Sequence, residues 1–310
     1  MQNYIKLKPV FKQMIWGGNQ LKQTFNFKVP FDHVGEAWLV SAHPEGASKV
    51  ENGELKGELL PDVYRQYRNN FGPGSNCDFP FLIKMIDANQ DLSVQVHPDD
   101  AYAKQHENGR GKYESWVFLK TDADGRLCLG HNAQSVEEFE TMIAQKRYDD
   151  LLRYIPIEKG DVVDLPPGTV HALCEGTMVY ECQQNSNITY RIYDYDRKDQ
   201  DGKLRELHLE QALAVLKAPD KPEKLKHRSD LQPLVHNPYF SLFQKAVEDE
   251  LTLLMDDVFV ALTVIEGETY INTHPLRQGE SMLVLPAVKE IKMQGKATVL
   301  IAKPSVESLV

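Results

Sequence analysis

The stretch GDVVDLPPGTVHAL, residues 160–173, decides the fold that the sequence predicts. Its first two residues form a turn, and the β-branched run that follows predicts a strand over 162–165. The Pro-Pro-Gly sequence at 166–168 then forces a tight corner, because proline fixes the backbone and glycine permits a sharp bend. The chain returns as a second strand that carries His171. Two short strands joined at such a corner indicate an antiparallel β-protein.

The stretch DLSVQVHPDD, residues 91–100, predicts another strand, and this one has two different faces. Successive side chains of a strand point to opposite sides of its sheet. Apolar residues therefore share one face and polar residues share the other, which sets Leu92, Val94 and Val96 against Ser93, Gln95 and His97. A face with an amide and an imidazole two residues apart is either wet surface or the wall of a site.

The composition is that of a globular protein. Of the 310 residues, 42% are hydrophobic and 26% are charged, which suffices for one large domain or two of ordinary size. No apolar run approaches the roughly 18 residues that span a bilayer, and lysines interrupt the N-terminal segment. We therefore expect a cytoplasmic protein without membrane contact. The net charge of -10 argues against nucleic-acid binding but allows an anionic small substrate.

The four cysteines show no spacing typical of a metal or redox motif. They are Cys77, Cys128, Cys174 and Cys182. We expect them to be reduced structural thiols, which agrees with a cytoplasmic setting.

Short β-forming runs between Gly, Pro and Asp turns dominate the chain, which favours a sandwich or barrel over a parallel α/β fold. Helical patterns are few, and they cover residues 58–72, 135–155 and 206–217. The second of these begins with a capping box formed by Ser135 and Glu138. The sequence therefore predicts a mainly β protein with a few helices.

We expect two β-units in the chain. Residues 1–216 would form a metal-bearing jelly-roll domain, 217–233 a linker rich in proline and charge, and 234–310 a small all-β domain. GDVVDLPPG at 160–168 resembles GESMLVLPA at 279–287, but the second copy lacks a histidine at the matching place. Either the second unit is a degenerate copy of the first, or two strand–turn sequences match by chance.

The spacing of Gly, Pro, Gly and His in residues 160–171 resembles the second motif of the cupin superfamily of jelly-roll barrels, although Glu175 replaces the usual asparagine. QVHPDD, KYESW, PPGTVHAL and NITYRIYDYDR, in this order, resemble the type I phosphomannose isomerase family in its short bacterial form. WGG, GEAWLVSAHPEG and FPFLIKMIDA do so as well, and the match runs to about residue 197. Larger relatives often have proline where Tyr113 stands, and they carry a helical insertion for which this chain has little room.

This resemblance implies a set of site residues. The family's zinc ligands fall on Gln95, His97, Glu114 and His171, which implies one Zn²⁺ per chain. Its active-site arginine falls on Arg191, and its lysine-x-glutamate element makes Lys112 a catalytic candidate. Ser93, Lys84 and Glu181 fall on further pocket positions, with Glu181 as a candidate for catalysis and the other two for substrate binding.

The implied function is the interconversion of mannose 6-phosphate and fructose 6-phosphate through an enediol. Zinc would polarise the sugar oxygens, and an always-charged Arg191 would stabilise an enediolate or clamp an anion. Glycines beside Lys112 allow the backbone to bend and bring its ammonium toward a phosphate. The proton carrier is a carboxylate such as Glu181, a histidine or a metal-bound water, and the residue types leave this choice open.

Two other functions remain to be weighed, an iron-dependent cupin dioxygenase and a non-catalytic sugar-phosphate-binding cupin. The dioxygenase usually pairs two histidines as HxH, whereas Gln95 occupies the first position in this chain. A non-catalytic relative would have lost metal ligands, and this chain keeps all four. For the isomerase we expect a small sugar phosphate as partner, and a monomer or weak homodimer.

Overall fold

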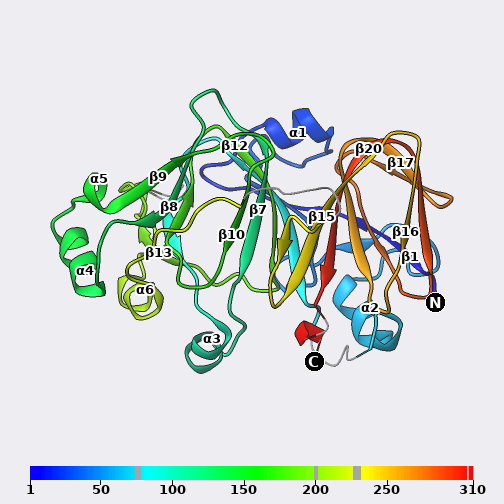
Figure 1. Cartoon of the computed structure of the whole chain (residues 1–310), viewed down its shortest axis with the longest axis horizontal. Helices are drawn as coiled ribbons and strands as arrows, with labels where there is room; N and C mark the ends of the chain where they lie inside the picture. The colour runs from blue at the N-terminus through cyan, green and yellow to red at the C-terminus, as the bar shows by residue number, and fades with distance from the viewer. Residues whose placement is uncertain (74–77, 199–201, 226–231, 306, 310) are drawn as a thin grey trace.

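A computed structural model describes residues 1–73, 78–198, 202–225, 232–305 and 307–309 of the chain. Three antiparallel β-sheets form the molecule, with short helices at their edges (Figure 1). The predicted mainly β, cupin-like class is confirmed. The sheets face one another as layers, and no closed barrel forms among the described residues. No helix in the described part of the chain is long and apolar enough to cross a bilayer.

The first two sheets face each other and hold the segments singled out in the sequence. The six-stranded sheet runs in the order β10 (Val162–Leu165), β7 (Glu114–Lys120), β12 (Thr177–Gln184), β5 (Phe81–Ala88), β3 (Glu36–Val40) and β2 (Val10–Lys12). The five-stranded sheet runs in the order β13 (Tyr190–Tyr193), β6 (Val94–Val96), β11 (His171–Leu173), β8 (Arg126–His131) and β9 (Leu152–Pro156).

The third sheet has nine strands and contains the C-terminal part of the chain. Its order is β14 (Val235–His236), β15 (Phe240–Val247), β20 (Glu290–Pro304), β17 (Val260–Ile271), β19 (Ser281–Val284), β1 (Tyr4–Lys8) and β4 (Lys49–Val50), with β16 (Glu250–Leu254) on β20 and β18 (His274–Arg277) on β17. The N-terminal strand β1 thus completes a sheet whose other long strands come from the end of the sequence. The predicted domain boundaries stay a prediction.

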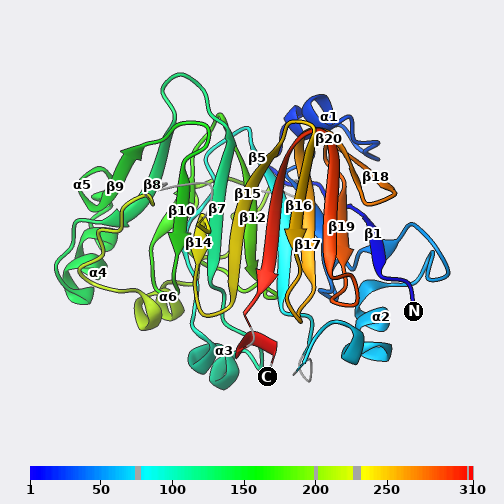
Figure 2. The same cartoon turned by 45° about the vertical axis from the view of Figure 1, so that its right-hand side comes forward.

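Six α-helices lie in the described part of the chain, and they are α1 (Gln20–Phe25), α2 (Leu60–Gln66), α3 (Asp100–His106), α4 (Val136–Ala144), α5 (Tyr148–Leu151) and α6 (Leu209–Val215). Two short 3-10 turns, Arg68–Asn70 and Glu307–Leu309, add to them. Helices α4, α5 and α6 gather at one end of the molecule, beside the five-stranded sheet, and the nine-stranded sheet forms the other end (Figures 1 and 2). The six-stranded sheet is the middle layer.

Two of the predicted helices form in shortened versions, as α2 and α6. The prediction of one helix over 135–155 is wrong. Ser135 caps α4 as expected, because its side chain accepts a hydrogen bond from the backbone N–H of Glu138. The helix ends at Ala144, and Lys146 then adopts a left-handed conformation with φ of 55°. The short helix α5 follows, and residues 152–156 form strand β9. The apolar residues of β9 pack against β8, and this sheet pairing overrides the local helical pattern.

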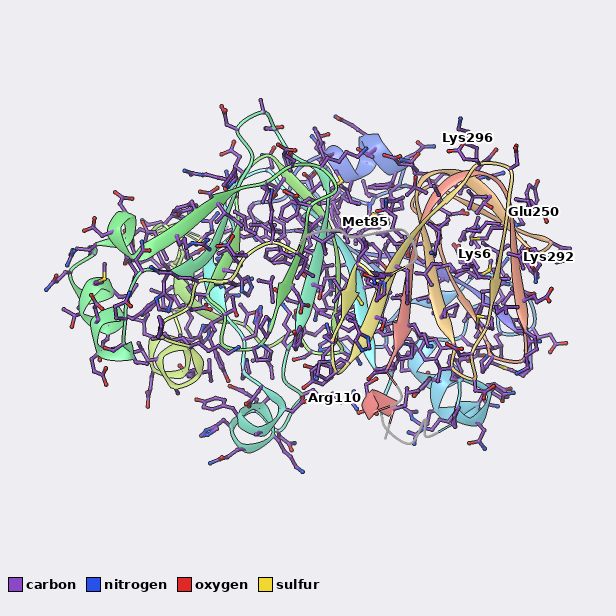
Figure 3. The ribbon with its side chains drawn as sticks, in the orientation of Figure 1. Lys6, Met85, Arg110, Glu250, Lys292 and Lys296 are labelled. Atoms are coloured by element: carbon purple, nitrogen blue, oxygen red, sulfur yellow. The ribbon has the colours of Figure 1, made fainter. Side chains whose placement is uncertain are left out.

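The central strands of the middle sheet are buried on both faces, because the sheet lies between the other two. In β5, Ile83 and Met85 point toward the nine-stranded sheet, and Met85 lies near the centre of the molecule in Figure 3. Charged side chains such as Lys292 and Lys296 lie far from it on the nine-stranded sheet. Ile86 points the other way, into an apolar cluster shared with the five-stranded sheet. The middle sheet therefore separates two of the molecule's apolar clusters.

The two faces predicted for the strand at 91–97 are confirmed, except for the first apolar residue, Leu92. Val94 and Val96 are fully buried and pack with the helices outside the five-stranded sheet. Leu92 instead packs inward with Ile86 and Trp116, because the strand becomes regular only at Val94. Of the cysteines, Cys128, Cys174 and Cys182 are buried and free, as expected, and Cys77 lies outside the described residues.

The described part of the predicted linker packs on the sheets. Gly168 accepts a hydrogen bond from the Lys217 backbone, and single bridges join Asp220 to His131 and Leu225 to Val162. This segment crosses from the five-stranded to the six-stranded sheet on its way to β14.

Strands β14 to β20 of the nine-stranded sheet are called the C-terminal unit below. Phe259, which precedes β17, joins this unit to the middle sheet through aromatic packing. It is fully buried, and its ring centroid lies 5.4–5.6 Å from those of Phe71, Phe79 and Phe81. We expect Phe259→Ala to lower the free energy of unfolding by about 3–5 kcal/mol, because it removes buried apolar area and leaves a cavity. Phe259→Leu should cost less. Urea titration followed by tryptophan fluorescence measures both, and an unchanged midpoint for the alanine variant would contradict this account.

Candidate metal centre and substrate cavity

Three strands bring His97, Glu114 and His171 together between the two facing sheets. Glu114 opens β7 in the six-stranded sheet, while His171 opens β11 and pairs with Gln95 across to β6 in the five-stranded sheet. His97 follows the end of β6. All three side chains are at most 2% exposed. Their nearest ligand atoms lie within 4.8 Å of one another.

Both histidine rings are held by backbone carbonyl groups. The Nδ1 atom of His97 lies 2.8 Å from the carbonyl oxygen of Ile188, and that of His171 lies 2.9 Å from the carbonyl oxygen of Thr169. Because a carbonyl oxygen only accepts, each Nδ1 carries the proton and each neutral ring turns the lone pair of Nε2 inward. This is how protein metal ligands are commonly oriented.

Glu114 faces these inward lone pairs. Its Oε1 lies 2.9 Å from Nε2 of His171, and its Oε2 lies 3.5 Å from Nε2 of His97. Neither oxygen has a hydrogen-bond donor in good geometry among the described residues, although both are buried. A lone pair that faces a carboxylate oxygen is favourable only when a proton or a metal ion lies between them. The residues present therefore fit a divalent metal ion.

Gln95 lies beside this cluster, as the resemblance implies. Its side-chain amide reaches to 3.5 Å from Nε2 of His171. Rotation of the amide by half a turn presents its oxygen at the same place. The structure thus brings three of the four expected ligands into one cluster and places the fourth at its edge.

The electrostatics keep the cluster ready for a cation. Burial, and then the positive charge of Lys112, lower the pKa of His97 to about 3, so that its ring is neutral at physiological pH. Burial alone would raise the pKa of Glu114, but Lys112 and the two histidines outweigh burial and hold it well below its usual range. A neutral imidazole and an ionised carboxylate are the forms that bind metal.

The glycines beside Lys112 suggested that its ammonium reaches toward a phosphate. In the structure, the ammonium instead contacts the metal cluster. Its Nζ lies 2.7 Å from Oε2 of Glu114 and 3.2 Å from Nε2 of His97, and the side chain is almost fully buried. The ammonium thus lies at the edge of the metal cluster, where it also borders the adjoining cavity.

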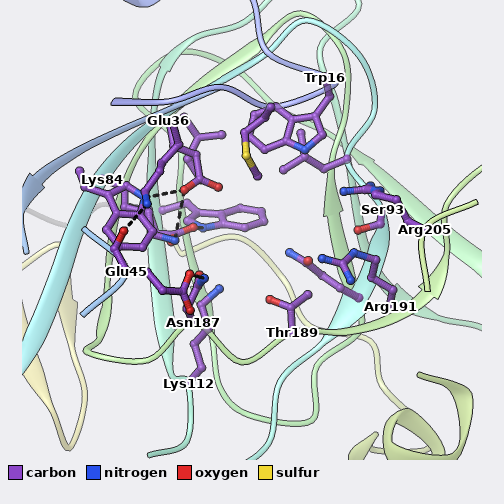
Figure 4. Close-up of a pocket in the computed structure, with 18 of the residues that line it drawn as sticks. Trp16, Glu36, Glu45, Lys84, Ser93, Lys112, Asn187, Thr189, Arg191 and Arg205 are labelled. Atoms are coloured by element: carbon purple, nitrogen blue, oxygen red, sulfur yellow. Dashed lines mark hydrogen bonds and ion pairs between the residues drawn. The ribbon is translucent and has the colours of Figure 1, made fainter. Parts of the chain in front are cut away.

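This cavity of about 270 Å³ opens beside the cluster, between the two sheets. Ser93, Gln95, Lys84, Lys112, Glu181 and Arg191 all line it, so the polar face of β6 forms part of a cavity wall rather than open surface. Figure 4 shows Lys84 and Glu36 on one side of the cavity, Arg191, Arg205 and Ser93 on the other, and Lys112 near Asn187. Trp16 also forms part of the wall.

Two carboxylates share one lysine on the six-stranded wall. Nζ of Lys84 lies 3.4 Å from Glu181 and 3.7 Å from Glu36. Indole N–H groups hold both acids, since Trp116 donates to Glu181 at 2.8 Å and Trp38 donates to Glu36 at 2.6 Å. Burial, and then repulsion from Glu114, raise the pKa of Glu181. Burial opposes the charge of Lys84, but the carboxylates around it outweigh burial and raise its pKa.

The opposite wall holds two arginines. Arg191 is on β13, and its Nε is buried without a hydrogen-bond partner among the described residues. Burial, and then the charge of Arg205, lower the pKa of Arg191, which shows that the two guanidinium groups lie in each other's field. Arg205 donates through Nε to Asp194 at 2.7 Å and through Nη2 to the same carboxylate. The sequence reasoning missed Arg205, because it lies in an irregular segment that no periodic pattern marks.

The fold and the site together define a cupin-like β-protein with a candidate metal centre in its interior. The sequence model of the family described as "Phosphomannose isomerase type I, catalytic domain" matches residues 4–116. The chain is 40% identical over 306 residues to mannose-6-phosphate isomerase ManA of Bacillus subtilis, an alignment that covers 95% of this chain and 97% of that protein. It is also 40% identical over 315 residues to the probable mannose-6-phosphate isomerase GmuF of the same organism, with 98% and 100% covered.

A crystal structure of mannose 6-phosphate isomerase from Bacillus subtilis matches this structure with a TM-score of 0.93 at 36% identity, and the match covers 97% of this chain and 99% of that one. The chain belongs to the type I phosphomannose isomerase family, whose members are aldose–ketose isomerases. The dioxygenase and the non-catalytic binding protein find no support among these relatives.

Asp194 fixes Arg205 at the cavity wall, and its charge makes the stability of the fold depend on pH. It is 4% exposed and accepts hydrogen bonds from Arg205 and, at 2.6 Å, from Arg197. Burial alone would raise its pKa, but these two arginines outweigh burial and lower the pKa below its ordinary value of 3.8. A carboxyl with a depressed folded-state pKa stabilises the fold above its unfolded pKa, and this stabilisation is lost as pH falls through the folded pKa.

We therefore expect Asp194→Asn to lower the free energy of unfolding by about 1–3 kcal/mol near neutral pH. The difference from wild type should shrink at pH values below 3.8. Urea unfolding at several pH values measures it, and Asp149→Asn, which removes an exposed carboxylate, is the control. A difference that does not vary with pH would show that the charge of Asp194 is irrelevant.

Proposed function

We propose that the protein interconverts mannose 6-phosphate and fructose 6-phosphate with one Zn²⁺ held by His97, Glu114, His171 and Gln95. The observation that carries this proposal is the buried His–Glu–His cluster beside a cavity with carboxylates on one wall and arginines on the other. Family membership and full-length relatives named as mannose-6-phosphate isomerases support the choice of reaction.

The donor set favours zinc among divalent ions. Two imidazole nitrogens and a carboxylate are the usual protein ligands of a catalytic zinc, and an amide oxygen or water fills the remaining position. Bound at this place, the ion would supply Lewis-acid stabilisation to the negative charge that develops on the sugar oxygens.

The arginine wall suits the phosphate group. Arg191 has donors that no described residue uses, and Asp194 fixes the fork of Arg205 by binding two of its nitrogens. Guanidinium groups bind phosphate through paired hydrogen bonds. Ser93 and Thr189 line the cavity beside these arginines and offer further hydroxyl donors (Figure 4).

With the phosphate at that wall, the carbonyl end of the sugar extends toward the carboxylates. Glu181 takes the proton from C2 of the aldose and returns it to C1 of the enediol, while the hydroxyl proton moves from O2 to O1. Its raised pKa suits a group that must hold a proton for part of the cycle. Lys84 and Lys112 border the same part of the cavity and stabilise negative charge on the sugar oxygens.

Glu181→Gln tests the assignment of the proton carrier. We expect kcat to fall by about 10²–10⁴-fold, because an amide cannot accept the proton. Metal content should stay at the wild-type level, because Glu181 is not in the ligand cluster. A coupled assay that reports fructose 6-phosphate measures the rate, and Glu140→Gln on the exposed face of α4 is the matched control. Near wild-type turnover would move the proton transfer to another group.

His171→Ala tests the metal site directly. We expect zinc affinity to fall by more than the roughly 10–100-fold that follows the loss of an outer partner of a metal ligand. Zinc per chain, measured by mass spectrometry after dialysis, should drop in this variant and stay unchanged in His236→Ala, whose histidine is exposed. Chelation of the wild-type protein should abolish turnover, and added zinc should restore it. Full activity after complete removal of metal would overturn the zinc assignment.

A further inference from the structure

The loop between α3 and β7 carries Lys112 into the site, and it is fixed along its length. The backbone N–H of Gly109 donates to Ala103 at 3.2 Å, and that of Lys112 donates to Pro98 at 3.0 Å. The carbonyl oxygen of Arg110 accepts from the hydroxyl of Ser186 at 2.9 Å. This loop is therefore held more firmly than its two glycines suggest.

Asp100, at the start of α3, holds the residue before Lys112. Its Oδ1 accepts from the backbone N–H of Gly111 at 2.8 Å and from the amide of Gln184 at 3.0 Å. Gly111 lies so close to the start of α3 that a Cβ atom would come within 2.4 Å of the backbone of Asp99. Only glycine allows the loop this approach.

A matching set of contacts holds the residue after Lys112. The backbone N–H of Tyr113 donates to the side chain of Gln184 at 2.9 Å, and its hydroxyl donates to Asp164 at 2.7 Å. Asp164 is a residue of β10 and also accepts from Ser115 at 2.5 Å. Lys112 is thus fixed from both sides by groups that belong to the middle sheet and α3.

The C-terminal unit supplies the outermost members of this network. Tyr239 donates its hydroxyl to Oδ2 of Asp100 at 2.7 Å, and Asn237 donates to Asp164 at 3.4 Å. Both residues belong to the turn between β14 and β15, where the side chain of Asn237 accepts from the backbone N–H groups of Tyr239 and Phe240 at 3.0 Å. Ser305 binds the carbonyl oxygen of Tyr239 at 2.9 Å. The turn is therefore a rigid support.

We propose that Tyr239, acting through Asp100, is a positioning residue that holds the Lys112 ammonium at the active site. This inference rests on the proposed function, in which Lys112 stabilises charge on the substrate. It gives the C-terminal unit a part in turnover, although none of the described residues of that unit lines the cavity. The ammonium must stay within hydrogen-bond reach of Glu114 and beside the substrate at once, and displacements near 1 Å are enough to lower the rate of such a site.

The experiment compares Tyr239→Phe and Asp100→Asn with Tyr270→Phe, which alters an exposed tyrosine of the same unit. We expect the first two variants to lower kcat by about 3- to 10-fold, the effect of losing one hydrogen bond. Zinc content and the urea midpoint of Tyr239→Phe should stay near wild type. Amide hydrogen exchange of the segment 109–114 should become faster in both variants and stay unchanged in Tyr270→Phe.

A double-mutant cycle separates positioning from general destabilisation. In a Lys112→Ala background, Tyr239→Phe should cause no further loss of kcat, because the group that it positions is absent. The same fold loss in both backgrounds would overturn the proposal, as would faster exchange at 109–114 without any change in kcat. Full activity of Lys112→Ala alone would instead contradict the role of Lys112 in the proposed function, whatever the exchange data show for the loop.

Discussion

A fully buried carboxylate, that of Glu114, is the constraint around which the region between the six-stranded and five-stranded sheets is arranged. An ionised group in the interior is tolerated only when charges or dipoles of opposite sign surround it. Lys112 supplies a charge from the same edge of the sheet, and the two histidines approach from the facing sheet. The 2.9 Å contact between Glu114 and His171 therefore sets how closely the two sheets approach at this end. Next to this contact, the apolar cluster around Ile86 and Trp116 fills the space between the sheets, and the Trp116 ring lies 5.2 Å from that of His171.

The middle sheet lies between the cavity and the C-terminal unit. Its inner face carries Glu114, Glu181 and Lys84, and its outer face packs on the C-terminal unit through residues such as Met85 and Tyr180. Because every residue of β5 and β12 is buried, a shift of either neighbouring layer is transmitted to the strands that hold the acids. The C-terminal unit is thus packed rigidly against the strands that line the cavity.

Local patterns in the sequence were enough to identify the strands of the site. Alternation at 93–97 and the Pro-Pro-Gly corner before His171 correctly predicted which residues face inward, since period and turn chemistry act over a few residues. The helix expected over 135–155 failed, because a strand pairing with β8 decides residues 152–156. Arg205 and Tyr239 could not be found in this way. Tyr239 meets Asp100 across 139 residues, and such contacts depend on topology that no local pattern contains.

The pairing of β1 with β19 has a consequence for biosynthesis. Tyr4 aligns with Val284, so β1, which pairs on its other side with the nearby β4, can pair with β19 only after most of the residues between them have been made. Until then the side chains of Ile5 and Leu7, which are fully buried in the finished fold, lack the strand that flanks them on the β19 side. Contacts of such long sequence separation slow folding and leave intermediates with exposed strand edges. The nascent chain is therefore most vulnerable to aggregation while the ribosome is still producing the C-terminal sheet, and chaperones that shield hydrophobic segments would act in that interval.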